Sequence, residues 1–125
     1  MPSHRRLARW LPPLALMVLI FVFSAQPSLD SGLGTVDLIG RKVIHFLEYA
    51  LLCFLWWRAL EPGLGARRAA LTAFMICSAY AATDELHQSF VDDRHGTPVD
   101  WLIDSAGAGA AAWRLRLGLR RRAAA

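Results

Sequence analysis

Cysteine is scarce in this sequence, which has only Cys53 and Cys77 among its 125 residues. Two cysteines supply neither a disulfide framework nor the repeated spacing of a zinc site. Both lie inside long apolar stretches, where a thiol serves as a small apolar side chain. These observations exclude the disulfide-rich and zinc-finger classes of small protein.

A polar stretch long enough to form a soluble domain is also missing. Hydrophobic residues make up 55% of the chain and its mean hydropathy is +0.33, which is too apolar for an ordinary soluble domain. The net charge of +4 could indicate nucleic acid, but arginines beside a membrane span are more simply explained as anchors that favour anionic lipid headgroups. We therefore expect membrane lipids as partners and no nucleic acid.

Four apolar segments qualify as expected membrane spans, because about 20 mostly apolar residues cross the bilayer core. They cover residues 10–25, 38–60, 69–90 and 99–115, of which the last is the least apolar. Pro12 and Pro13 fit the opening turn of the first span. The sequence predicts an all-α fold, with one integral membrane domain over residues 1–125 built as a bundle of four transmembrane helices.

A cleaved signal peptide is the alternative interpretation of the first segment, since arginines precede its apolar stretch. Cleavage after Ala25 would place the bulky Phe23 at the third position upstream, which fits poorly. Cleavage after Ser24 would place Val22 there, which is tolerated. We expect the segment to be retained as a span.

Arginines gather near those ends of the expected spans that would share one side of the membrane. They precede the first span, lie in or just before the loop 61–68, and fill the tail: Arg5, Arg6, Arg9, Arg58, Arg67, Arg68, Arg114, Arg116, Arg120, Arg121 and Arg122. The other two loops carry only Arg41, Lys42 and Arg94. Because lysine and arginine mark cytoplasmic loops, we expect both termini in the cytoplasm and a multi-pass plasma membrane protein.

Acidic residues show the opposite distribution. The stretch TDELHQSFVDDRHGTPVDWLID, residues 83–104, holds six of the chain's ten acidic residues, at the outer ends of two expected spans. At about 1.5 Å per residue, Asp84 and Asp104 lie on the order of 9 Å inside those ends. His45 has a comparable depth in the second span, and Glu48 lies one turn deeper. The sequence therefore predicts a layer of polar side chains in the outer leaflet.

Helical spacing indicates which of these side chains face the same way. Three polar stripes result, one on each of the last three spans: Lys42, His45, Tyr49 and Glu48; Asp84, Gln88 and Glu85; Asp100 and Asp104. An ionised side chain at a helix centre costs about 2.5–3.5 kcal/mol on insertion scales, so we expect the stripes to face one another. Acids outnumber the outer cations, which leaves protonated carboxyls, a bound cation or a positively charged ligand as ways to balance them.

Three stretches resemble the VanZ-like family of small membrane proteins over nearly the whole chain. They are FSAQPS at 23–28, RKVIHFLEYALL at 41–52 and TDELHQSFVDDRHGTPVDWLIDSAGAGAAA at 83–112. The resemblance adds Gln26 and Arg94 to the polar positions, and it implies a bacterial cell-envelope protein of a family named for a member linked to teicoplanin resistance. It implies no particular reaction, substrate or cofactor. The acidic loop around Asp92 departs from the family's Pro-Gly form.

The leading hypothesis is an outer-leaflet pocket that binds an envelope lipid or glycan headgroup, such as a lipid-linked envelope precursor, or a glycopeptide. Its expected ligand-binding residues are Lys42, His45, Glu48, Tyr49, Asp84, Glu85, Gln88, Arg94, Asp100 and Asp104, with Gln26. Alternatives are an intramembrane hydrolase or transferase, with His45, Glu48, Asp84 and Asp104 as metal ligands, and a proton-coupled transporter, which would need an oligomer. The plainest alternative is that the carboxylates only hold the helices together.

Overall fold

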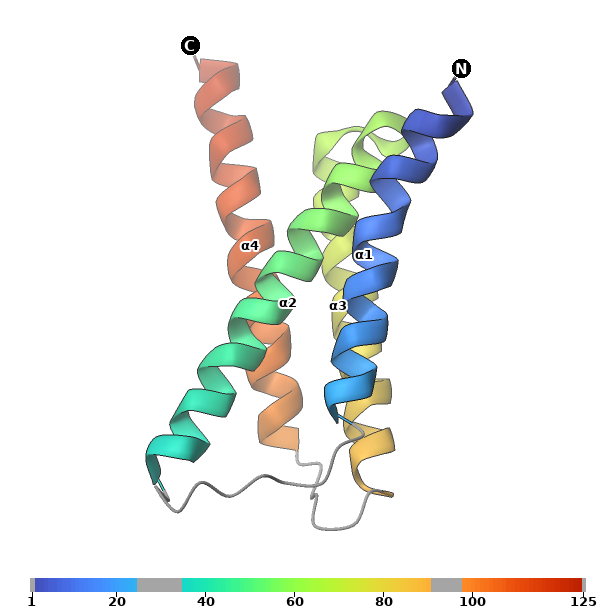
Figure 1. The fold of residues 1–125 in the computed structure, drawn as a ribbon. Helices are drawn as coiled ribbons and strands as arrows, with labels where there is room; N and C mark the ends of the chain where they lie inside the picture. The colour runs from blue at the N-terminus through green and yellow to red at the C-terminus, as the bar shows by residue number, and fades with distance from the viewer. Residues whose placement is uncertain (1, 25–34, 91–97, 125) are drawn as a thin grey trace.

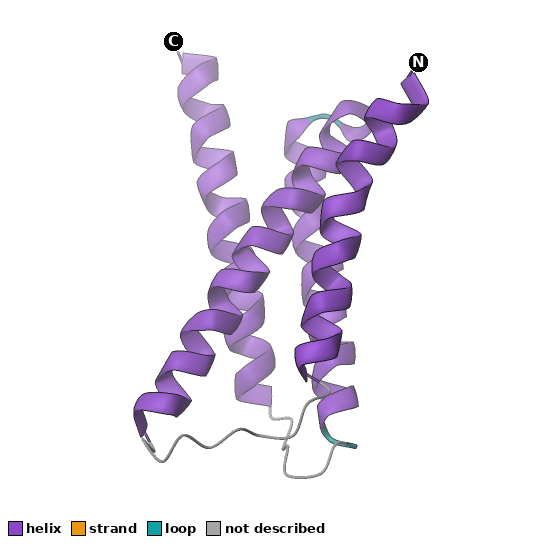
Figure 2. Ribbon diagram, viewed as in Figure 1, coloured by secondary structure: helices purple, strands orange, loops and turns teal. Residues whose placement is uncertain are grey.

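The computed structural model describes residues 2–24, 35–90 and 98–124. Within these ranges the chain forms four helices and no strand, as Figures 1 and 2 show: α1 (Pro2–Ser24), α2 (Thr35–Leu64), α3 (Ala66–Gln88) and α4 (Pro98–Ala124). The predicted all-α fold with four helices is confirmed. Gln26, Asp92 and Arg94, which the sequence analysis singled out, lie outside the described residues.

Helices α2, α3 and α4 pack against one another, and α1 packs mainly against α2. Both termini lie at one end of the bundle, which they share with the connection between α2 and α3 (Figure 1). We call this the terminal end. The first residues of α2 and α4 and the last residues of α3 lie at the opposite end. The polar stripes of the last three helices therefore occupy the end far from the termini.

The connection between α2 and α3 is much shorter than the loop 61–68 expected from the sequence. Helix α2 continues to Leu64 and α3 begins at Ala66, so Gly65 alone separates them. Gly65 has a φ of +80°, a conformation that glycine adopts without the steric cost of a Cβ. The indole Nε1 of Trp57 donates a hydrogen bond of 3.0 Å to the Ala66 carbonyl. The two helices thus form a tight hairpin.

Helix α1 starts earlier than the sequence indicated. It begins at Pro2, so Pro12 and Pro13 lie inside the helix and the expectation of an opening turn is wrong. A proline has no backbone N–H, so the carbonyls of Ala8 and Arg9 lack their usual i+4 donors. The arginine-rich residues before the prolines nevertheless continue the helix. This extension carries Arg5 and Arg9 alongside the last turns of α2, where they line two cavities.

Small side chains dominate the contact between the helices. Ala73, Cys77 and Ala81 of α3 are fully buried, as is Ala108 of α4. A Cβ added to Gly107 would overlap the backbone carbonyl oxygen of Phe46, so α2 and α4 approach closely there. Larger buried residues come mainly from α2 and include Tyr49, Leu52, Cys53 and Trp56.

Large apolar side chains, in contrast, cover much of the outside. Leu19, Val43, Leu51, Met75 and Leu102 are all exposed. Among the described residues, two stretches are long and apolar enough to cross a membrane, His4–Phe23 and Ile39–Leu64. Buried carboxylates combined with exposed leucines invert the usual distribution of a water-soluble protein. The inversion is typical of helices that face lipid.

Candidate functional site

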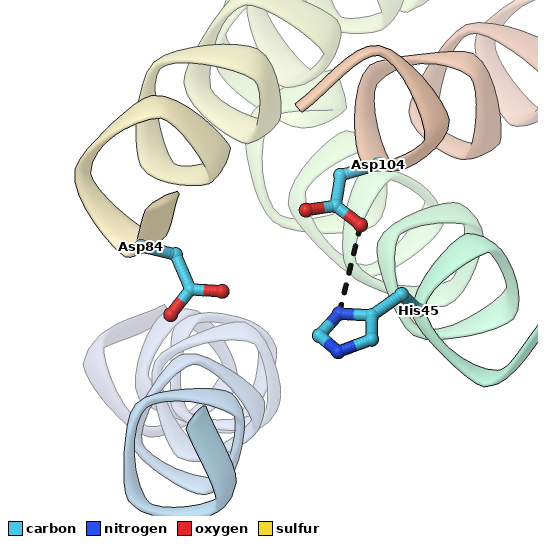
Figure 3. Close-up of side chains that lie close together, drawn as sticks. All are labelled: His45, Asp84 and Asp104. Atoms are coloured by element: carbon cyan, nitrogen blue, oxygen red, sulfur yellow. Dashed lines mark ion pairs between the residues drawn. The ribbon is translucent and has the colours of Figure 1, made fainter. Parts of the chain in front are cut away.

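Three polar side chains from three helices converge at the end of the bundle far from the termini. They are His45 of α2, Asp84 of α3 and Asp104 of α4, which point toward a common space in Figure 3. One nitrogen or oxygen atom of each lies within 4.8 Å of the corresponding atoms of the other two. His45 Nδ1 lies 3.6 Å from Asp104 Oδ1.

The packing of α2 against α4 explains part of this convergence. Gly107 lets the two backbones meet at Phe46, and Asp104 lies one turn before Gly107 on α4. That turn brings Asp104 beside His45, the residue before Phe46. Side chains one turn apart share a helix face. The contact of Gly107 with Phe46 therefore places Asp104 on the face of α4 that meets α2, at the level of His45.

Contacts between α3 and α4 fix the third side of the site. The indole Nε1 of Trp101 donates a 3.0 Å hydrogen bond to the Ser78 carbonyl. The hydroxyls of Ser78 and Ser105 lie 3.1 Å apart and share a hydrogen bond. Ser105 directly follows Asp104, and Ser78 precedes Asp84 by less than two turns of α3. These polar contacts join α3 to α4 next to Asp104 and less than two turns from Asp84.

The site is buried, and several of its polar atoms have no hydrogen bond. Asp84 is 2% exposed and Asp104 is 1% exposed. Within the described part of the chain, His45 Nδ1, Asp104 Oδ2 and the Tyr49 hydroxyl are buried without a hydrogen-bond partner. The Tyr49 hydroxyl also interacts electrostatically with both aspartates. Buried polar atoms are nearly always hydrogen-bonded, so such a concentration in one place is unusual.

An ion pair lies closer to the end of the bundle than the buried trio. Lys42 Nζ is 3.9 Å from Asp100 Oδ1, and both side chains are about one-third exposed, at 37% and 32%. Lys42 precedes His45 by one turn, and Asp100 precedes Asp104 by one turn. The pair therefore sits over the trio on the side where α2 and α4 begin. We call Lys42, His45, Asp84, Asp100 and Asp104 the polar cluster.

The other residues expected at the site have different positions. Glu48 Oε2 is 4.0 Å from His45 Nδ1, but Glu48 is not part of the group of three whose atoms meet. Tyr49 is buried beside the aspartates and Glu85 is partly buried. Gln88 is the last residue of α3, and its side chain is outside the description, as are Gln26 and Arg94.

Two residues near the site were missed by sequence reasoning because their partners belong to α1. His87 stacks on Phe21, with ring centroids 4.5 Å apart and an interplanar angle of 27°. The Tyr80 hydroxyl donates a hydrogen bond to the Met17 carbonyl. Both contacts attach α1 to α3. Helical spacing shows which residues share a face but not which helix that face meets, so no signal in the sequence identifies these pairs.

The terminal end carries two cavities that the sequence did not indicate. One has a volume of about 580 Å³ and is lined by Arg5, Arg6, Arg9, Trp10, Ala59, Leu60, Pro62, Gly63 and Leu64. The other, of about 480 Å³, is lined by Arg5, Ala8, Arg9, Trp57, Arg58 and Glu61. Arginine side chains and apolar walls therefore occur together at this end. The acidic polar cluster lies at the other end.

Comparison with known proteins gives one match. The family model described as VanZ/LLP1 matches residues 9–119, a range that includes the whole of α2 and α3, most of α1 and α4, and the whole polar cluster. No curated protein and no solved structure matches the chain.

Proposed function

The chain belongs to the VanZ/LLP1 family, and on that premise we propose that it is a multi-pass protein of the bacterial plasma membrane whose polar cluster binds the headgroup of an envelope lipid or glycan. The observation that carries the proposal is the convergence of His45, Asp84 and Asp104 from three helices, where His45 Nδ1 and Asp104 Oδ2 have no hydrogen-bond partner among the described residues. A headgroup supplies both donors and acceptors, so it can complete those bonds.

The membrane location is supported by the apolar outer surface of the bundle. Exposed side chains such as Leu19, Leu51 and Met75 would face acyl chains, while Asp84 and Asp104 are shielded by neighbouring helices. Helices α3 and α4 are less apolar than α1 and α2 because they supply much of the alanine, glycine and polar interior. In this proposal all four helices cross the bilayer, since membrane helices with small and polar faces pack inward.

The orientation follows from the charges at the two ends. Arginines are concentrated at the terminal end, where Arg5, Arg9 and Arg58 line the cavities and Arg67 and Arg68 flank the α2–α3 turn. Positively charged ends are retained in the cytoplasm, so both termini would be cytoplasmic. The polar cluster then lies in the outer leaflet, within reach of lipid-linked envelope precursors. A protein that holds such a precursor, or a glycopeptide itself, would alter susceptibility to teicoplanin-like compounds.

The cluster has two layers that would contact different parts of a headgroup. Lys42 and Asp100 are partly exposed and form an outer layer, in which the ammonium can meet a phosphate or carboxylate and the carboxylate can meet a hydroxyl or an amine. The partly exposed His45 and the buried Asp84 and Asp104 form the layer beneath it. A ligand entering from the membrane surface would therefore meet the ion pair first.

Native mass spectrometry of the full chain released from mild detergent tests the proposal. We expect a discrete lipid or glycolipid adduct on the wild type and its loss in Lys42→Ala and Asp104→Asn. Arg67→Ala, which removes an exposed cation at the terminal end, is the matched control and should keep the adduct. Circular dichroism and gel filtration establish that each variant folds. An adduct that persists in both cluster variants, or no adduct on any folded form, would overturn the proposal.

A further inference from the structure

We infer that His45, Asp84 and Asp104 form a binding site for one divalent metal ion of the zinc or manganese class. The three side chains come from three different helices and meet inside the bundle (Figure 3). The second part of the inference rests on the proposed function. In it, the bound ion contacts the phosphate of a headgroup at the polar cluster. The site and its ligand can be tested separately.

The separations between the side chains are close to those that a metal ion requires. Zinc–nitrogen and zinc–oxygen bonds of about 2.0–2.2 Å place two ligands of a tetrahedral ion about 3.4 Å apart. His45 Nδ1 and Asp104 Oδ1 are 3.6 Å apart, and all three ligand atoms lie within 4.8 Å of one another. A shift of up to about 1.4 Å in one side chain would bring all three ligand atoms to bonding distance.

The missing hydrogen bonds of these polar atoms favour a metal site over a purely structural contact between helices. Asp104 is 1% exposed, and its Oδ2 atom has no hydrogen-bond partner in the described part of the chain. His45 Nδ1 is also buried without one, although it lies beside Asp104. A lock between helices would satisfy these atoms through hydrogen bonds, as Ser78 and Ser105 do nearby. A metal ion provides the missing partner for a neutral imidazole nitrogen and a carboxylate oxygen.

The charge of the site points the same way. With both carboxyls ionised, Asp84, Asp104 and His45 carry a net negative charge even when the imidazole is protonated. Lys42, one turn away, already lies 3.9 Å from Asp100. Moving an ionised carboxylate from water into the protein interior costs several kcal/mol, on the order of the marginal stability of a small domain. A divalent cation would neutralise both aspartates at once.

The ligand set indicates which ion and which headgroup. One imidazole and two carboxylates suit zinc, manganese or ferrous iron better than calcium, which prefers oxygen ligands alone. Three protein ligands leave at least one coordination position open. Carboxylates alone would repel a phosphate, whereas an ion held between them attracts one. The headgroup is therefore one that carries a phosphate or pyrophosphate, with Lys42 as a second contact.

Metal binding to the full chain in mild detergent tests the site. After treatment with a chelator and its removal, the protein is titrated with Zn²⁺ by calorimetry and then with Co²⁺, whose visible absorption reports tetrahedral ligation directly. We expect one ion per chain and at least a tenfold loss of affinity in His45→Gln, Asp84→Asn and Asp104→Asn. Glu61→Gln, a carboxylate substitution at the terminal end, is the control and should bind as the wild type does.

The outcomes separate the metal site from the headgroup proposal. No stoichiometric binding by the folded wild type, or equal binding by Asp104→Asn, overturns the site. The headgroup adduct is then measured with and without chelator. An adduct lost on chelation and restored by Zn²⁺ supports the bridging ion, whereas an adduct that survives chelation overturns it and leaves headgroup binding intact. Metal binding without any adduct supports the site and overturns the headgroup proposal.

Discussion

Asp104 is the residue whose burial demands the most explanation. Its side chain is almost fully enclosed, with the imidazole of His45 at 3.6 Å as its measured ion-pair partner. A carboxylate in such a place is expensive unless its oxygens are bonded. Tyr49 adds a buried hydroxyl close to the same carboxylate. The proposed ligand would account for this arrangement, because it would bond to the buried oxygens.

Replacing Tyr49 by phenylalanine removes only its hydroxyl and so tests whether that group contributes to stability. Because its hydroxyl is buried without a hydrogen-bond partner, Tyr49→Phe should leave the free energy of unfolding unchanged or raise it by up to about 1 kcal/mol. Tyr80→Phe is the comparison, since the Tyr80 hydroxyl donates to the Met17 carbonyl and its loss should cost about 0.5–1.5 kcal/mol. Denaturant unfolding in detergent measures both. Greater destabilisation by Tyr49→Phe than by Tyr80→Phe would show that the hydroxyl has a structural role.

The position of these residues was partly predictable. Depth along each helix and 3.6-residue spacing indicated that His45, Asp84 and Asp104 face one another. Spacing could not distinguish them from Glu48, which shares the stripe with His45. Whether His45 or Glu48 reaches the aspartates depends on how α2 is rotated about its axis and on the side-chain rotamers. The periodicity of a single sequence determines neither of these. The ion pair between Lys42 and Asp100 was missed for the same reason.

At the scale of the elements, the close contact between α2 and α4 determines the site. Only a residue without a side chain fits at position 107, because the carbonyl of Phe46 occupies the space where a Cβ would lie. Small residues allow membrane helices to approach closely and gain packing energy. The contact at Gly107 is one turn from Asp104, so the geometry of the polar cluster depends on it.

Alanine substitutions at two glycines of α4 distinguish the effect of close helix packing on stability from the effect of helix propensity. Gly118→Ala should raise stability by up to about 1 kcal/mol, because nothing lies within 4 Å of an added Cβ and alanine favours a helix. Gly107→Ala should lower stability by about 1–3 kcal/mol, since α2 and α4 must separate. It should also weaken ligand binding at the polar cluster. Thermal unfolding measures the difference, and equal effects at both positions would contradict the close contact.

Long apolar runs were sufficient to predict four helices, but their ends were harder to predict. The two prolines of α1 suggested a helix start, whereas ten helical residues precede them. Residues 61–68 were expected to form a loop between two spans, yet α2 continues through Pro62 to Leu64. The local turn signals did not set the helix ends in either place, because the helix continues past the proline in each.

On the scale of the whole molecule, opposite charges are separated to opposite ends. Arginine-lined cavities occupy the terminal end, and the acidic polar cluster occupies the other. The outer surface between them is largely apolar. The separation matches the asymmetry of a bacterial membrane, in which cationic ends stay in the cytoplasm. The proposed headgroup binding requires this orientation, because it places the cluster where envelope precursors are found.

Cysteine labelling in cells tests the orientation, and with it the central claim that the polar cluster opens to the outer leaflet. On a background in which Cys53 and Cys77 are replaced by alanine, one cysteine is introduced at an exposed position at each end, as Ser89→Cys or as Gly63→Cys. We predict that a membrane-impermeant maleimide labels Ser89→Cys in intact cells and labels Gly63→Cys only after the membrane is opened. Labelling of Gly63→Cys in intact cells, with Ser89→Cys protected, would contradict the account.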